Sequence, residues 1–236
     1  GLVVPVVAAQ ETQESLLLTP PSRKYQVNPG QTIDDTFKVV NDGKTAYDLL
    51  IYSRPYSVND ASYKPNFIAT PANADAYKWV QLPKTLYHLE PGATQVIPFS
   101  IKTPDKADAG GHYGVIFAET QPATPTQGTS VLRKKRLGMI AYVTVKGDYK
   151  SAGEAAGENI PFWQVEPPLR ATLVAKNTGN ADFESDVTIT VKDMFGATKY
   201  TASKKFTLLP KTTRNMTMDW TASPWFGLFK IGTQQT

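Results

Sequence analysis

Residues 186–192 read Asp-Val-Thr-Ile-Thr-Val-Lys, a run in which apolar and polar side chains alternate. Val187, Ile189 and Val191 face one way along an extended chain, and the side chains between them face the other. This alternation predicts an antiparallel strand with one buried face. Similar short runs recur along the chain between turn residues at spacings of roughly 8–12 positions, and helical periodicity is nearly absent. Such spacing is typical of a β-sandwich.

An internal repeat extends this interpretation to the whole chain. Two apolar runs end in Asn-x-Gly and are followed shortly by an aromatic residue: Asn41, Gly43 and Tyr47 in the first half, and Asn177, Gly179 and Phe183 in the second. Later in each half come a Leu-x-Pro sequence, at Leu89 and Leu208, and a glycine loop that leads into an apolar run, at Gly111 and Gly227. The repeat predicts an all-β protein made of two tandem immunoglobulin-like antiparallel β-sandwich modules.

Composition divides the chain into four segments. Residues 1–14 form a leader, and residues 15–147 form the first immunoglobulin-like module, with an aromatic-rich insert over about residues 52–86. Residues 148–161 are small and polar without periodicity, which predicts a linker. The second module covers residues 162–236 and is expected to be truncated at its last strand.

Composition also excludes several classes of function. The chain has 236 residues, a formal net charge of +4 and no cysteine. Disulfides, cysteine zinc sites, iron–sulfur clusters and thiol nucleophiles are therefore excluded, and the charge excess is too small for a nucleic-acid-binding domain. His88 and His112 are expected to be solvated loop residues, and the acidic pairs lack the spacing of a calcium loop. We expect a protein that is not an enzyme and that has no metal or cofactor.

Two groups of residues are candidates for a binding site. The densest charge cluster consists of Arg133, Lys134, Lys135 and Arg136. These charges are suited either to an anionic polymer or to protecting an exposed strand edge from pairing with another sheet. In the aromatic insert, Tyr56 and Tyr63 lie among prolines and are predicted to be surface residues that bind a partner. The same aromatic residues would alternatively pack a long loop onto the sandwich.

Both ends of the sequence predict export. The first nine residues are small and apolar and end in Val7-Ala8-Ala9, which fits a signal-peptidase cut. At the other end, no run after Thr233 corresponds to residues 137–145, the closing strand of the first module. We therefore expect the native chain to continue past Thr236 with another strand and a membrane anchor. The predicted location is the extracellular face of the cell envelope.

A set of turn motifs resembles a known family. The motifs are Tyr25-Gln26-Val27-Asn28-Pro29-Gly30-Gln31, Asn41-Asp42-Gly43, Ser57-Val58-Asn59-Asp60-Ala61-Ser62-Tyr63, Leu89-Glu90-Pro91-Gly92 and Gly110-Gly111-His112-Tyr113-Gly114. In this order they resemble the WxL-interacting cell-surface proteins of Gram-positive bacteria, and similar two-module surface proteins of candidate-phyla bacteria. The resemblance implies a signal peptide, two sandwich modules, a C-terminal membrane helix, and binding of cell-wall polymer or partner proteins, with no catalytic residues.

Three functions remain open at this point. The leading prediction is an exported, non-enzymatic surface protein that binds cell-wall polymer or another surface protein. The alternative is a periplasmic assembly chaperone of the pilus type, which lends a strand to its subunit. The donor row would then be Leu137, Met139, Ala141, Val143 and Val145, and paired basic anchors in the interdomain cleft would distinguish this class. A glycan-active enzyme is the third, and it would need two carboxylates facing a cleft.

Overall fold

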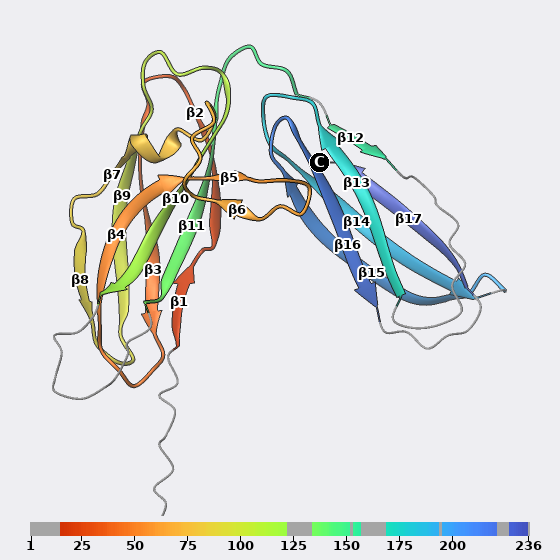
Figure 1. Cartoon of the computed structure of the whole chain (residues 1–236), viewed down its shortest axis with the longest axis horizontal. Helices are drawn as coiled ribbons and strands as arrows, with labels where there is room; N and C mark the ends of the chain where they lie inside the picture. The colour runs from red at the N-terminus through yellow and green to blue at the C-terminus, as the bar shows by residue number, and fades with distance from the viewer. Residues whose placement is uncertain are drawn as a thin grey trace, which may run out of the picture.

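The computed structural model describes residues 15–121, 134–151, 153–156, 169–193, 195–220 and 227–235. These residues fold almost entirely into β-strands, which form two immunoglobulin-like sandwiches one after the other along the chain (Figure 1). The all-β fold with two modules, predicted from alternation and the internal repeat, is confirmed. In Figure 1 the modules form the two arms of an inverted V, joined at the top by the chain that follows β11 (Arg136–Val145).

The first module packs two sheets face to face. One sheet consists, in spatial order, of β1 (Leu16–Thr19), β3 (Thr32–Asn41), β9 (Thr94–Lys102) and β7 (Val80–Gln81). The other consists of β2 (Ser22–Val27), β11, β10 (Gly110–Gln121), β4 (Tyr47–Pro55) and β8 (Leu86–Leu89). Paired strands are antiparallel, except that β2 runs parallel to β11. The two sheets enclose one core.

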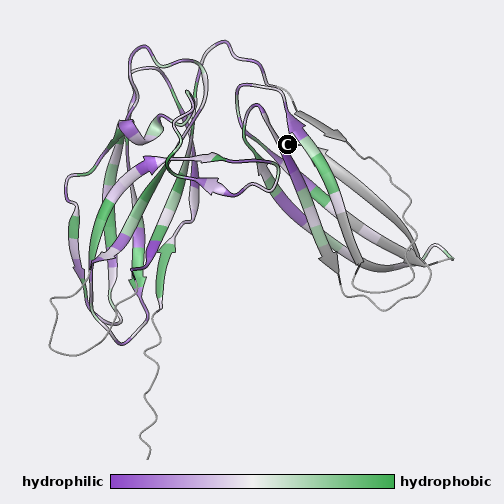
Figure 2. Cartoon of the chain, viewed as in Figure 1, coloured by the Kyte–Doolittle hydropathy of each residue, from purple (hydrophilic) through white to green (hydrophobic). Residues whose placement is uncertain are grey.

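Alternation along the strands supplies this core. On β3, Phe37 and Val39 are buried while Lys38 is exposed, and β9 buries Ile97, Phe99 and Ile101 in the same way. Figure 2 shows hydrophobic segments in green along the strands of the first module. The burial of alternate side chains fixes the register, because a shift by one residue would turn the apolar row to solvent.

The aromatic insert follows β4. It contains a two-stranded hairpin, β5 (Ser57–Val58) and β6 (Pro65–Asn66), and a short 3₁₀ helix, Ala76–Trp79, that leads into β7. Trp79 is buried as the last residue of this helix. Figure 1 shows the hairpin reaching across from the first module to the second.

The second module also has two sheets. One contains β12 (Gly153–Ala156), β13 (Leu169–Asn177) and β16 (Thr212–Trp220), and the other contains β15 (Thr198–Leu208), β14 (Phe183–Asp193) and β17 (Gly227–Gln235). Strand β12 lies within the stretch expected to be a linker. Because its residues pair with β13, this part of the stretch belongs to the second module. Among the described strands, β17 pairs only with β14 and forms the edge of its sheet.

The predicted Asn-x-Gly repeat is confirmed in atomic detail. The amide Nδ2 of Asn41 donates to the carbonyl oxygens of Thr45 (2.7 Å) and Leu89 (3.3 Å), and its Oδ1 accepts from Gly43 N (3.1 Å). In the second module, Asn177 makes the same three bonds, to Ala181 O (2.8 Å), Leu208 O (3.0 Å) and Gly179 N (2.9 Å). Each asparagine is fully buried and ties the turn after one strand to the Leu-x-Pro strand end.

Candidate functional site

The basic cluster lies at the start of β11. Arg133 falls outside the described residues, whereas Lys134, Lys135 and Arg136 lead directly into the strand. The guanidinium carbon of Arg136 lies 4.1 Å from the centroid of the Phe117 ring, close enough for a cation–π contact. The exposed ammonium of Lys134 is 3.8 Å from a carboxylate oxygen of Glu119. Both charges are therefore engaged with β10, the neighbouring strand.

The two tyrosines predicted to bind a partner lie inside the structure. Tyr56 is only 7% exposed and packs edge-on against Tyr142 with ring centroids 6.2 Å apart. Burial raises its pKa. Tyr63 is half-buried, and its hydroxyl accepts a hydrogen bond from Leu209 N of the second module (2.9 Å). Neither is a free surface residue, because the insert folds back onto the sandwich.

These tyrosines belong to a second apolar cluster on the outer face of the sheet that contains β10 and β11. Its buried members are Tyr56, Tyr113, Val115, Phe117, Tyr142 and Leu209. Most come from β10, β11 and the insert, but Leu209 comes from the second module. The sheet is thus covered on both faces at β10, which explains why this strand is buried along most of its length. Alternation alone does not reveal a strand of this kind.

The apolar row predicted to be a donor strand is buried in the first module's own core. Met139, Ala141, Val143 and Val145 are each at most 2% exposed and belong to the core of the first module. Leu137 is half-buried against the same core. The prediction that this row is available to a partner is wrong, because the odd-numbered residues of β11 face inward.

The backbone edge at the beginning of β11 is nevertheless open. Strand β2 covers this edge only from Ile140 onward, where Ile140 N donates to Pro21 O at 3.0 Å. Since backbone groups alternate in direction along a strand, Arg136 and Gly138 point to the same side as Ile140. No strand in the described part of the chain pairs with them there. An open edge of this kind is a template for a further strand.

Gly138 is required at this edge. A Cβ atom at this position would lie 2.8 Å from Cε1 of Phe117 and 2.9 Å from Cγ2 of Val115. Both contacts are too short for real carbon atoms, so the ring of Phe117 occupies the place of a side chain at position 138. The edge is therefore flat at Gly138 and flanked by the Arg136 guanidinium.

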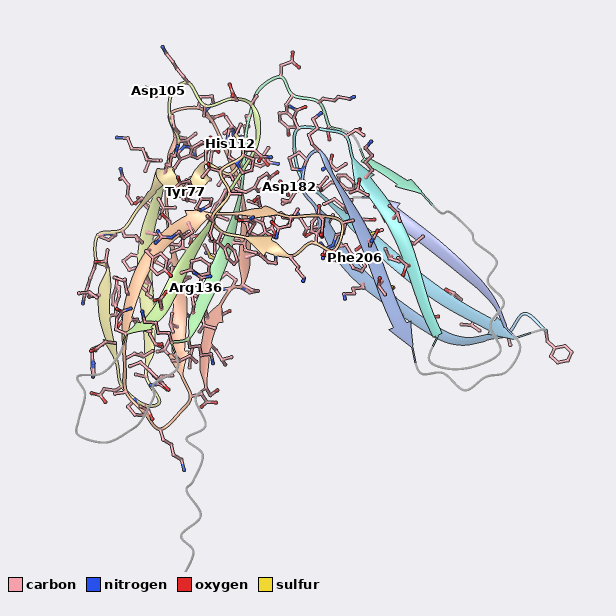
Figure 3. The ribbon with its side chains drawn as sticks, viewed as in Figure 1. Tyr77, Asp105, His112, Arg136, Asp182 and Phe206 are labelled. Carbon is pink, nitrogen blue, oxygen red and sulfur yellow. The ribbon has the colours of Figure 1, made fainter. Side chains whose placement is uncertain are left out.

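Polar contacts join the two modules beside the aromatic cluster. The hydroxyl of Tyr113 donates to Oδ1 of Asp182 (2.9 Å) and accepts from Asp182 N (3.0 Å). Burial, followed by the Asp182 charge, raises the pKa of Tyr113 far above its usual range. Lys24 extends the contact, with its Nζ 3.1 Å from Glu184 and 3.7 Å from Asp182. Figure 3 shows Asp182 on the side of the second module that faces the first.

The basic anchors expected of a pilus-type chaperone can be compared with these contacts. Lys24 of the first module and Arg214 of the second both lie between the modules. Lys24 retains 46% of its side-chain exposure but is paired with Glu184, and Arg214 stacks over Tyr63 and donates to Thr207 O (2.7 Å). In this structure, each of the two residues therefore contacts the other module of the same chain.

The histidines differ in environment. His88 is exposed to solvent, as expected, and lies between the carboxylates of Asp48 and Glu90, which raise its pKa. His112 is not a solvated loop residue: it lies in β10, is 6% exposed, and places its ring nitrogens 2.7 Å from Asp75 Oδ1 and from Asp108 O. Burial lowers the pKa of His112, but these two acceptors raise it by more, so the net shift is upward.

The described residues hold no group of three or more His, Asp or Glu side chains that could bind a metal ion. Within the same part of the chain, no helix has the length and apolar character needed to cross a membrane. The surface features that remain are strand edges and the contact between the modules.

Comparison with known proteins gives a fold likeness only. No protein-family model and no curated protein matches the chain. Among solved structures, the class 5 fimbriae chaperone CfaA has a TM-score of 0.48 and 12% identity, over 92% of this chain and 98% of that chain. A chain from the Salmonella enterica complex of the SafA pilin with the SafB chaperone has 0.47 and 11%, over 96% and 98%. The E. coli chaperone DraB has 0.46 and 13%, over 86% and 85%.

The leading prediction from sequence, a surface protein that binds cell-wall polymer, is wrong by this comparison. Of its proposed binding residues, Tyr56 is buried, whereas Lys134 and Arg136 are exposed and contact β10. The three structures named above are described as a fimbriae chaperone, a complex of a pilin with its chaperone, and a chaperone, which fits the alternative prediction better than the leading one. At these identities and scores, the likeness extends no further than the arrangement of the strands.

Proposed function

We propose that the chain is a non-enzymatic assembly chaperone of the pilus type, exported to the periplasm, which pairs the open edge of β11 with a strand of a partner subunit. The observation that carries the proposal is the outward backbone of Arg136 and Gly138, which lie before the point where β2 begins to pair with β11. Two residues present two N–H and two C=O groups. At roughly 0.5–1.5 kcal/mol net for each hydrogen bond, a partner strand would gain about 2–6 kcal/mol from this edge.

The setting of the edge suits strand addition. Strand β11 is paired along its whole length with β10, from Arg136 opposite Glu119 to Val145 opposite Gly110. The edge of β11 that faces β10 is hydrogen-bonded even just before the strand begins, because Thr120 N donates to Lys135 O at 2.9 Å. The strand is therefore held in an extended conformation before a partner binds, so that less conformational entropy is lost on binding. Affinity of this kind depends on main-chain bonds, and the side chains beside the edge add specificity.

The edge can be tested with two substitutions at one position. Arg136→Pro removes the outward N–H, which an edge strand tolerates, whereas Arg136→Ala keeps it; both remove the guanidinium. We expect Arg136→Pro to weaken binding to a pilin-type subunit from the same organism about tenfold relative to Arg136→Ala, as measured by isothermal titration calorimetry. Equal affinity of the two variants, with both folded by circular dichroism, would argue against pairing at this edge.

A further inference from the structure

The tip of the β5–β6 hairpin is a tight turn held by its own side chains. Tyr63 N donates to Asp60 O (2.9 Å), and Ser62 N donates to Oδ1 of Asp60 (2.9 Å). The turn places Tyr63 at a φ of 62°, in the left-handed region that a bulky residue rarely adopts. A residue in this region costs of order 1–3 kcal/mol and persists only where surrounding contacts hold it. For Tyr63, several of those contacts come from the other module.

The tip binds the second module through backbone and side chain. Asn215 N in β16 donates to Ala61 O (2.8 Å), which extends the hydrogen bonding of that strand toward the first module. The Tyr63 hydroxyl accepts from Leu209 N and also contacts Oγ1 of Thr212. The guanidinium carbon of Arg214 lies 4.3 Å from the centroid of the Tyr63 ring. One loop thus contacts both ends of the segment 209–215.

The base of the hairpin is fixed in the first module. Tyr56 and Phe67, which flank the hairpin, lie with ring centroids 6.2 Å apart, and Phe67 packs edge-on against Phe117 of β10 at 5.0 Å. Tyr56 packs on Tyr142 of β11. The hairpin is therefore connected to the core sheet of one module and to β16 of the other.

A second contact lies closer to the covalent connection. There Gly111 N donates to Asn180 O (2.8 Å), beside the hydrogen bonds between Tyr113 and Asp182. Two modules joined by one chain and one small contact are expected to move relative to each other. A second contact, displaced from the first, opposes rotation about it. Figure 1 shows the hairpin crossing below the top of the inverted V.

We infer that the insert is a strut: the turn at 60–63 holds the two modules at one angle, so that a partner meets a preformed arrangement of both. The inference does not depend on the proposed function, since it concerns the free protein. It assigns the positioning role to Tyr63, whose ring and hydroxyl make most of the side-chain contacts across the modules at this point.

The absence of cysteine allows a clean distance measurement. Cysteines introduced at Lys38 and Thr201, exposed positions on different modules, would carry nitroxide spin labels for double electron–electron resonance. We expect one narrow distance distribution in the parent protein and at least a twofold broader one in Tyr63→Ala. Tyr63→Phe, which keeps the ring over Arg214 but loses the hydroxyl, should lie between the two. Tyr52→Ala is the matched control: it removes a half-buried tyrosine that packs on Phe117 in the same aromatic cluster.

Circular dichroism and thermal unfolding would establish that each variant remains folded. The strut is supported if the width increases for Tyr63→Ala and remains at the parent value for Tyr52→Ala. An unchanged width in folded Tyr63→Ala would overturn it, and so would equal broadening in both alanine variants. A failure of the β11 edge test would leave this result unaffected, because the measurement uses no partner.

Discussion

Replacing the buried asparagine of each repeat should destabilise its own module strongly. Asn177 is fully buried, and its side chain makes three hydrogen bonds to the backbone. Alanine at this position would leave one N–H and two C=O groups buried without these partners. A lost bond costs roughly 1–3 kcal/mol when a buried group is left unsatisfied. With partial rehydration of the turn, we expect Asn177→Ala to lower the free energy of unfolding of the second module by about 3–5 kcal/mol.

The isosteric variant tests the direction of these bonds. Asn177→Asp keeps an acceptor for Gly179 N but points a second oxygen at the carbonyls of Ala181 and Leu208. It should therefore destabilise the module at least as much as Asn177→Ala, although its shape is unchanged. If the asparagine only filled space, aspartate would be tolerated.

Urea unfolding followed by amide hydrogen exchange measures the stability of each module separately, because β3 lies in the first module and β13 in the second. Asn177→Ala and Asn177→Asp should reduce protection in β13, and Asn41→Ala should reduce it in β3. A loss below about 0.5 kcal/mol for Asn177→Asp would refute the reasoning, since that is the range of ordinary surface substitutions.

Three further outcomes are expected. Gly138→Ala should weaken the first module in thermal unfolding, because its Cβ would overlap Phe117; an unchanged melting temperature would contradict that packing. The pKa of His112 is raised in the folded state, so the stability that its protonation adds is present below its ordinary pKa and is lost as the pH rises through the folded-state pKa. The difference in unfolding free energy between the parent and His112→Gln should therefore shrink from pH 6 to pH 9. A difference that grows with pH would contradict the direction of the shift. Lys24→Ala should cost no more than about 1 kcal/mol in urea unfolding, because half-exposed ion pairs contribute little, and a larger loss would show that the pair with Glu184 is a main contact between the modules.

Local patterns in the sequence predicted the fold well. The spacing of Asn41 and Asn177 from their glycines depends only on the geometry of one turn, and both turns form as expected. Burial of alternate residues in β3 and β9 likewise depends on strand geometry alone. Such features are visible in sequence because neighbouring residues determine them.

The candidate site depended on contacts that are distant in sequence. Tyr63 and Leu209 meet across two modules, and nothing near Tyr63 distinguishes a tyrosine that packs from one that binds. Likewise, the row Met139, Ala141 and Val143 has the pattern of an apolar strand face, but the pattern does not say whose core it enters. The open edge at Gly138 depends on where β2 begins, which is set by pairing with a segment more than a hundred residues away in sequence. A signal was available at Gly138, since glycine inside an apolar strand indicates close approach of another group.

The proposal that β11 receives a partner strand is tested most directly by amide hydrogen exchange at Arg136 and Gly138, measured by NMR with and without a pilin-type subunit from the same organism. In the free protein both amides face the open edge and should exchange much faster than Ile140, whose N–H is bonded to Pro21 O. In the complex, the account predicts that exchange at both positions slows at least a hundredfold. Formation of the complex with unchanged exchange at Arg136 and Gly138 would contradict it.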